Sequence, residues 1–202
     1  MFCLCQPTAS TWVAIASKNL DAVLADHAHC EMKAATTALS LALRAHENLD
    51  AVLTLTRLAE EELDHFRRVV EFLGRRGLAL GQSPVDSYAV ELRKATSHLP
   101  GALPNPIVDR LLVGALIEAR SCERFKLLLD NWPDSAEREL FDFYRELFEC
   151  EARHCVQYRE LAIRFAASLP ERIDARLRQL AEAEGAIVAR LGDALPTATV
   201  HG

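Results

Sequence analysis

Glycine and proline are scarce in this sequence, with 8 of each among 202 residues. Clusters of β-branched residues that could serve as strands are also few. Alanine, leucine, glutamate and arginine are abundant instead, and these residues favour helix. Half of the residues are apolar, which argues against a disordered chain and suffices for a substantial core. We therefore expect an all-α protein that folds as a single domain over residues 1–202.

Long hydrophobic runs are absent as well. The longest, residues 111–117, is far shorter than the about 18 apolar residues that a transmembrane helix needs. Residues 1–5 lack the basic and apolar regions of a signal peptide. We therefore expect a cytoplasmic protein with no membrane partner.

The cysteines are too few and too dispersed for a disulfide framework. Four of the six fall inside predicted helices: Cys30, Cys122, Cys150 and Cys155. We expect reduced thiols, as in most cytosolic proteins. Cys3-x-Cys5 could bind a metal, but a frayed N-terminus is the simpler interpretation.

A net charge of −6 removes any general signature of nucleic-acid binding. Local basic groups can still coexist with an acidic total. The candidates are Arg67-Arg68, Arg75-Arg76, Arg93-Lys94, and Arg120 with Arg124 and Lys126. Most groups of this kind are simply solvated helix faces.

Apolar residues at helical spacing predict four long helices with shorter ones at both ends. We expect helices at about residues 10–17 (N-capped by Ser10), 18–45, 49–76, 106–129, 135–166 and 170–191, and a frayed tail at 192–202. Residues 77–105 would form a crossover that holds a short helix near 86–96. A long connection between the second and third bundle helices is what a ferritin-like four-helix bundle requires.

Two short motifs carry most of the functional information. Residues 62–65 and 151–154 both read Glu-x-x-His, and a lone glutamate precedes each motif by a similar interval, Glu31 by 31 residues and Glu118 by 33. With 18 Glu and 7 His, chance predicts only about 0.6 copies of such a motif. Two copies at matched intervals therefore indicate a repeated site.

The residue types in this repeat suit a pair of metal ions. An i, i+3 spacing places Glu and His on one helix face, and here they interrupt otherwise apolar stripes. Burying an unpaired carboxylate costs several kcal/mol, which two divalent cations would offset. Carboxylate and imidazole ligands suit iron or manganese. The candidate ligands are Glu31, Glu62, His65, Glu118, Glu151 and His154.

Two neighbouring glutamates are rejected as ligands. Glu118 is preferred to Glu123 because it gives the better repeat interval, and Glu149 points away from the stripe of Glu151. Cys122 follows Glu118 by one turn, and a structural role is favoured over one in guiding protons.

Outer-shell partners are less well defined by the sequence. Each metal-binding histidine needs an acceptor for its second N–H, and Asp64 and Asp109 are weak candidates. His27 lies one turn before Glu31, where it could support that carboxylate.

The residues around these ligands resemble the MiaE-type tRNA hydroxylases over roughly residues 12–166. The segments that carry the resemblance are Asp26-His27-Ala28-His29-Cys30-Glu31, Glu61-Glu62-Leu63-Asp64-His65-Phe66, Glu118-Ala119-Arg120-Ser121-Cys122-Glu123-Arg124-Phe125 and Glu151-Ala152-Arg153-His154.

The resemblance implies an O2-dependent non-haem di-iron monooxygenase that hydroxylates the isopentenyl group of 2-methylthio-N6-isopentenyladenosine in tRNA. Glu31, Glu62 and His65 would serve one iron and Glu118, Glu151 and His154 the other, with two of the glutamates bridging. Iron is favoured over manganese, and electrons would come from an external reductase or ferredoxin. tRNA phosphates would meet Arg120, Arg124 and Lys126, or the Arg75-Arg76 end, while the base turns out of its stack.

Three other functions share the ligand pattern or the helical composition. A ferritin-like iron store or oxidase would assemble into cages. A rubrerythrin-type peroxidase or a manganese catalase would use the same donors, although no Cys-x-x-Cys rubredoxin module is present. A metal-free helical interaction protein would leave six polar residues buried without a reason.

Overall fold

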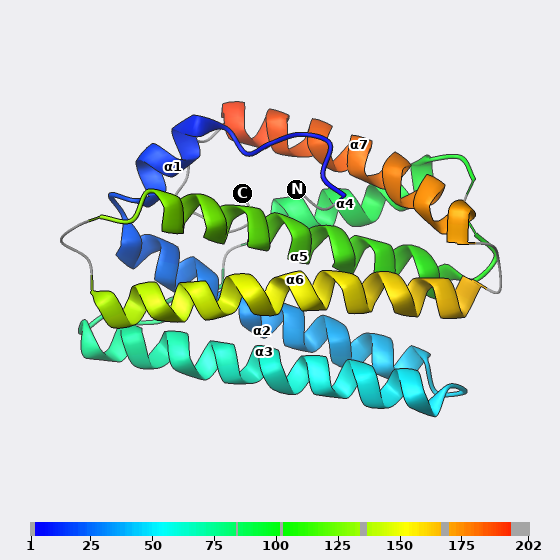
Figure 1. Cartoon of the computed structure of the whole chain (residues 1–202), viewed down its shortest axis with the longest axis horizontal. Coiled ribbons are helices and arrows are strands. Elements are labelled where there is room, and N and C mark those ends of the chain that lie inside the picture. Colours follow the sequence, from blue (N-terminus) through cyan, green and yellow to red (C-terminus); the bar gives the residue numbers. More distant parts are fainter. Residues whose placement is uncertain (1–2, 84, 102, 134–136, 167–169, 195–202) are drawn as a thin grey trace.

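The computed structural model describes all residues except 1–2, 84, 102, 134–136, 167–169 and 195–202. The described residues form helices and no strand (Figure 1). The helices are α1 (Ser10–Ala16), α2 (Leu20–Arg44), α3 (Leu49–Arg75), α4 (Ser87–His98), α5 (Pro106–Asp130), α6 (Arg138–Ala166) and α7 (Pro170–Ala194). The expected all-α class is therefore confirmed.

Four of these helices, α2, α3, α5 and α6, run along the long axis of the molecule (Figure 1). They pack as two pairs, α2 with α3 and α5 with α6, each joined by a short connection. The segment between α3 and α5 contains α4 and is the long crossover that the sequence predicted. On the outside of the bundle, α7 packs against α4 and α5.

The helix ends follow from local side-chain chemistry. Asn48 and Asp86 cap α3 and α4 by accepting hydrogen bonds from backbone amides three residues on, at 3.0 and 2.8 Å. Asn105 caps α5 by accepting from the backbone amide of Ile107, two residues on, at 3.2 Å, with Pro106 in the first turn. Gly77 follows α3 with a φ of +68°, a conformation that glycine adopts at little cost.

Some predicted boundaries differ from the structure. Ser10 is the first helical residue and makes no cap, because the chain enters α1 from Ala9. The second helix starts at Leu20. Just before it, the side-chain amide of Asn19 donates a hydrogen bond to the Ile15 carbonyl at 2.7 Å. Helix α7 continues to Ala194, so residues 192–194 are helical where fraying was expected. The predicted start of the fourth helix at 135 and the tail at 195–202 lie outside the described residues.

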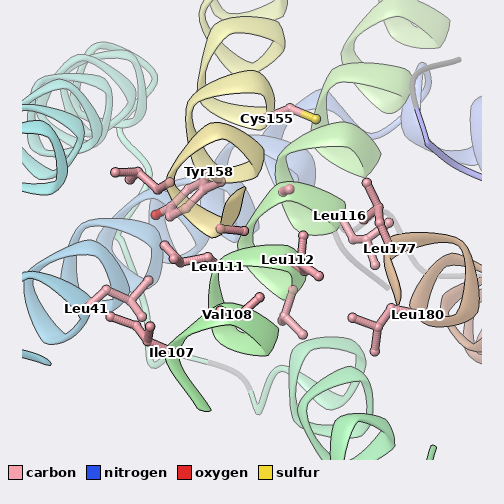
Figure 2. Close-up of a cluster of buried hydrophobic side chains, with 14 of the residues drawn as sticks. Leu41, Ile107, Val108, Leu111, Leu112, Leu116, Cys155, Tyr158, Leu177 and Leu180 are labelled. Carbon is pink, nitrogen blue, oxygen red and sulfur yellow. The ribbon is translucent and has the colours of Figure 1, made fainter. Parts of the chain in front are cut away.

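Two apolar clusters fill the bundle. One surrounds α5 and includes Leu41, Leu111 and Tyr158, with Leu180 of α7 on its outer side (Figure 2). The other lies toward α1 and is rich in aromatic rings, among them Phe125. On each of the four bundle helices, the two clusters occupy separate stretches of sequence. On each of these helices, the candidate ligands lie near the boundary between the two stretches.

The N-terminal residues that the structure describes pack against the bundle, which contradicts the fraying expected at Cys3-x-Cys5. Cys3 packs against the α5 cluster. Arg120 of α5 donates to the Gln6 carbonyl at 2.8 Å and to the Thr8 hydroxyl at 3.1 Å. The Thr8 hydroxyl in turn donates to Glu123 at 2.7 Å. All six cysteines are free thiols, as predicted. No helix in the described part of the chain has both the length and the apolar character needed to cross a bilayer.

Candidate dimetal centre

The structure brings all six predicted ligands together in the middle of the bundle. Each of the four long helices contributes, and α3 and α6 each present a Glu and a His three residues apart. Every one of the six side chains is buried, with the residues between 0 and 7% exposed. Solvated charges on a helix face are thereby excluded.

Their donor atoms form two overlapping sets. Within each set, all donor atoms lie within 4.8 Å of one another. The first set is Glu31, Glu62, His65 and Glu151. The second set is Glu62, Glu118, Glu151 and His154. Each position therefore has one glutamate and one histidine of its own and shares the two central carboxylates.

The histidines turn the same ring atom toward this centre. Nδ1 of His65 lies 3.5 Å from Glu31, 3.3 Å from Glu62 and 4.0 Å from Glu151, measured to the nearest carboxylate oxygen. Nδ1 of His154 lies 2.7 Å from Glu62 and 3.7 Å from Glu151. The two ring centroids are 6.1 Å apart. This arrangement follows the near-equivalence of the two Glu-x-x-His motifs in the sequence.

The buried carboxylates repel one another, and this repulsion shifts their pKa values. Burial raises the pKa of Glu118 well above its ordinary value, and the charge on Glu151 acts in the same direction. Burial and the charge on Glu31 likewise raise the pKa of Glu62. For Glu31, burial opposes ionisation, but contact with His27 prevails and lowers the pKa. Ionising all four carboxylates in this buried centre therefore requires positive charge close to them.

Two buried atoms of the centre lack a hydrogen bond of normal geometry, which fits a bound cation. Among the described residues, Oε2 of Glu151 has no hydrogen-bond partner, and Nδ1 of His154 forms no well-aligned hydrogen bond although a Glu62 oxygen lies 2.7 Å away. Leaving a buried polar atom unsatisfied costs about 1–3 kcal/mol. Metal coordination would satisfy both atoms, and the oxygen and nitrogen donors suit iron or manganese.

Glu61 supports one of these histidines and was missed by the sequence analysis. Nε2 of His154 lies 3.1 Å from its carboxylate. Cys150 and Arg153 donate to the same oxygen, each at 3.2 Å. Burial opposes ionisation of Glu61, but the hydrogen bond from His154 prevails and lowers the pKa. A carboxylate on the far nitrogen is the usual partner of a metal-binding imidazole.

The two aspartates expected in that role lie elsewhere. Asp64 is on the surface and pairs with Arg67 at 2.8 Å. Asp109 pairs with Arg176 of α7 at 2.7 Å. The prediction was wrong for both, because each carboxylate lies off the inner face of its helix and meets an arginine instead.

The other residues near the centre behave largely as predicted. His27 contacts the carboxylate of Glu31 through Nε2 and stacks on Tyr144, with ring centroids 5.4 Å apart. Cys122 donates to the Phe148 carbonyl at 3.5 Å, and burial raises the pKa of its thiol to about 12. A neutral thiol that donates to a backbone carbonyl fits the structural role favoured from the sequence.

The rejected glutamates also lie off the centre. Glu123 pairs with Arg120 and Thr8, and Glu149 is exposed on the outer face of α6.

Two of the three basic residues on α5 that were expected to meet phosphates are buried. Arg120 is 0% exposed and forms two 2.8 Å hydrogen bonds with Glu184 of α7. Arg124 is buried beside it, and Lys126 pairs with Asp130 at 2.6 Å. The prediction failed because the sequence does not reveal that α7 covers this face of α5.

The comparisons with known proteins agree with one another. The chain matches the family described as tRNA-(MS[2]IO[6]A)-hydroxylase (MiaE) over residues 1–196. It is 42% identical over 157 residues to a tRNA 2-(methylsulfanyl)-N(6)-isopentenyladenosine(37) hydroxylase of Pseudomonas putida, covering 77% of this chain and 73% of the relative. It is 31% identical over 232 residues to the protein of the same name from Salmonella typhimurium, covering 90% and 82%.

A solved structure shares the whole fold. Protein 43 with aldehyde deformylating oxygenase activity from Synechococcus superposes with a TM-score of 0.85 at 34% identity, covering 100% of this chain and 96% of that one. The ferritin-like architecture expected from the sequence is thereby confirmed.

Proposed function

Because the chain belongs to the MiaE family of tRNA hydroxylases, we propose that it hydroxylates the isopentenyl group of 2-methylthio-N6-isopentenyladenosine in tRNA. The observation that carries the proposal is the pair of overlapping Glu/His sets in the core of a chain that matches this family over residues 1–196. The named relatives supply the substrate, and the geometry supports the class of chemistry.

The six residues would hold two iron ions. Glu31 and His65 would bind one ion, Glu118 and His154 the other, and Glu62 and Glu151 would bridge them. When bound, the iron pair supplies O2-dependent hydroxylation, in which one oxygen atom enters the C–H bond and the other leaves as water, with two electrons from an external reductase or ferredoxin and two protons.

The surrounding residues orient the ligands. Glu61 accepts the Nε2–H of His154, which leaves the Nδ1 lone pair directed at the centre. His27 contacts one oxygen of the Glu31 carboxylate, and His65 lies near the other. The two apolar clusters keep bulk water from both ends of the centre and so protect a strongly oxidising reaction.

Other chemistries are possible on the same scaffold, and the comparisons favour the tRNA substrate. Neither the family nor the two curated relatives point to iron storage, a peroxidase or a manganese catalase. The Synechococcus protein has aldehyde deformylating oxygenase activity, so an aldehyde belongs among the substrates tested.

Nucleoside mass spectrometry would test the function. The iron-loaded protein, a reductase with its ferredoxin, and O2 would be incubated with tRNA that carries the prenylated adenosine. We expect that nucleoside to gain one oxygen atom, and that the change Glu151→Gln abolishes the gain. Glu149→Gln, an exposed change on the same helix, is the matched control. Iron-dependent O2 consumption with a long-chain aldehyde but none with tRNA would overturn the proposal.

A further inference from the structure

A cavity of about 500 Å³ opens between α2, α4 and α5. Its walls are mostly apolar and include Leu41 of α2, Val90 of α4, Val113 of α5 and Tyr158 of α6. This volume lies within the range of about 300–1,000 Å³ that is usual for pockets that enclose a small ligand. We call it the α2–α4–α5 pocket.

The pocket reaches the dimetal centre. Glu118, a ligand candidate of the second position, lines it, and Cys30, the neighbour of Glu31, lines its other side. A second cavity of about 600 Å³ lies between α3 and α6, but none of the six candidate ligands lines it. It carries five carboxylates and three arginines, a balance that would repel phosphates. The α2–α4–α5 pocket is therefore the better route to the centre.

Tyr158 and Gly114 shape the inner end of the pocket. A Cβ atom added at Gly114 would lie 3.1 Å from Cδ1 of Tyr158, so the ring packs directly on the backbone of α5. Burial raises the pKa of Tyr158 well above its ordinary value, and the wall it forms is therefore neutral. Glu118 follows Gly114 by one helical turn. A branched apolar tail lying between Tyr158 and Val113 would point its end at Glu118.

Cationic side chains surround the mouth. Arg93 of α4 and Arg110 of α5 line the pocket, and both are exposed. Within the described residues, neither arginine forms an ion pair, whereas Arg75 pairs with Glu139 at 2.8 Å. Lys33 and Asp86 line the same edge, and Asp86 also caps α4. Arg93 belongs to one of the basic pairs recognised in the sequence.

From these contacts we propose that the α2–α4–α5 pocket receives the prenylated adenine and that Arg93 and Arg110 bind the phosphates on either side of it. The inference rests on the proposed function and assigns its substrate site. The nucleotide leaves its stack, its apolar tail extends toward Glu118, and the backbone stays at the cationic mouth. Apolar walls suit the isopentenyl group, and paired cations suit the charge of the anticodon loop.

The phosphate contacts are tested by binding. The double change R93A/R110A should weaken binding of a prenylated anticodon stem–loop at least tenfold. It should also lower the slope of log Kd against log salt by about 1.4–1.8, because each of the two phosphate contacts contributes about 0.7–0.9. The matched control R57A/R164A removes one exposed arginine of α3 and one of α6 and should change neither value. Equal weakening by both double variants would overturn the assignment, and so would an unchanged slope in R93A/R110A.

The apolar wall is tested by filling it. V113F should lower kcat/KM for prenylated tRNA more than tenfold, while iron stoichiometry and the affinity for unprenylated tRNA stay within twofold of the parent. If V113F does not fold, as judged by circular dichroism, T37F places the same bulk on the half-exposed lip of the pocket. Full activity in the folded variant would overturn the pocket while leaving the function intact. If the parent protein binds tRNA through Arg93 and Arg110 but hydroxylates nothing, the proposed function is wrong and the assigned binding site stands.

Discussion

Glu61 illustrates how a single side chain can tune the centre from outside the ligand set. Its carboxylate, 3.1 Å from Nε2 of His154, fixes which ring nitrogen carries the proton. It was missed in the sequence because its neighbour Glu62 occupies the inner face of α3. Only the approach of α6 brings Glu61 against a histidine 93 residues away.

We expect Glu61→Gln to weaken iron binding by about 10–100-fold, the usual cost of removing a supporting carboxylate. An amide cannot supply the charge that strengthens this hydrogen bond. Competition with a coloured iron chelator would measure the affinity directly. The control is Glu60→Gln, an exposed change one residue away. Parent-like affinity in both variants would show that Glu61 does not act through His154.

The six candidate ligands could be picked out from motif spacing and from the apolar stripes that they interrupt, since a buried glutamate demands a compensating charge, and the structure brings them together. What spacing could not give was the sharing of Glu62 and Glu151 between both positions. That depends on how far α3 and α6 approach each other, which no pattern within a single helix records.

At the scale of the elements, α7 contributes more buried ion pairs to the fold than its amphipathic sequence suggested. Two of its charged residues are buried, Arg176 against Asp109 and Glu184 against Arg120. The sequence predicted the helix but not this docking, because the partners are 67 and 64 residues apart along the chain. The same docking turned a supposed basic surface into a buried network.

Arg176→Ala should therefore destabilise the fold by about 3–5 kcal/mol, because it leaves the buried Asp109 carboxylate unpaired. Arg178→Ala is the control, since Arg178 lies two residues along the same helix and is exposed. It should change stability by no more than about 0.5 kcal/mol. Urea unfolding followed by circular dichroism would give both values. Comparable losses in the two variants would mean that α7 is held by apolar contacts alone.

At the scale of the whole molecule, the candidate metal ligands form a polar layer between the two apolar clusters. This layer should couple the stability of the fold to metal binding. Bound ions would satisfy Oε2 of Glu151 and Nδ1 of His154 and neutralise the carboxylates around them. Folding and metal binding should thus reinforce each other.

Anaerobic addition of Fe(II) at one hundred times its Kd should stabilise the protein by about 2.7 kcal/mol per site. For a chain of this length the thermal midpoint should rise by roughly 5–10 °C per site. A chelator should reverse the shift, which differential scanning calorimetry would record. The variant Glu151→Gln, with one shared ligand lost, should show a smaller rise. An unchanged midpoint at saturating iron would contradict binding in the core.

The bonds made by Arg120 also bear on the order in which the chain is synthesised. Its guanidinium is held by Gln6 and Thr8 near the start and by Glu184 near the end. While the ribosome is still translating α6, this arginine has only its N-terminal partners and Glu123. The face of α5 around it can close only once α7 emerges, so final compaction should await nearly complete translation.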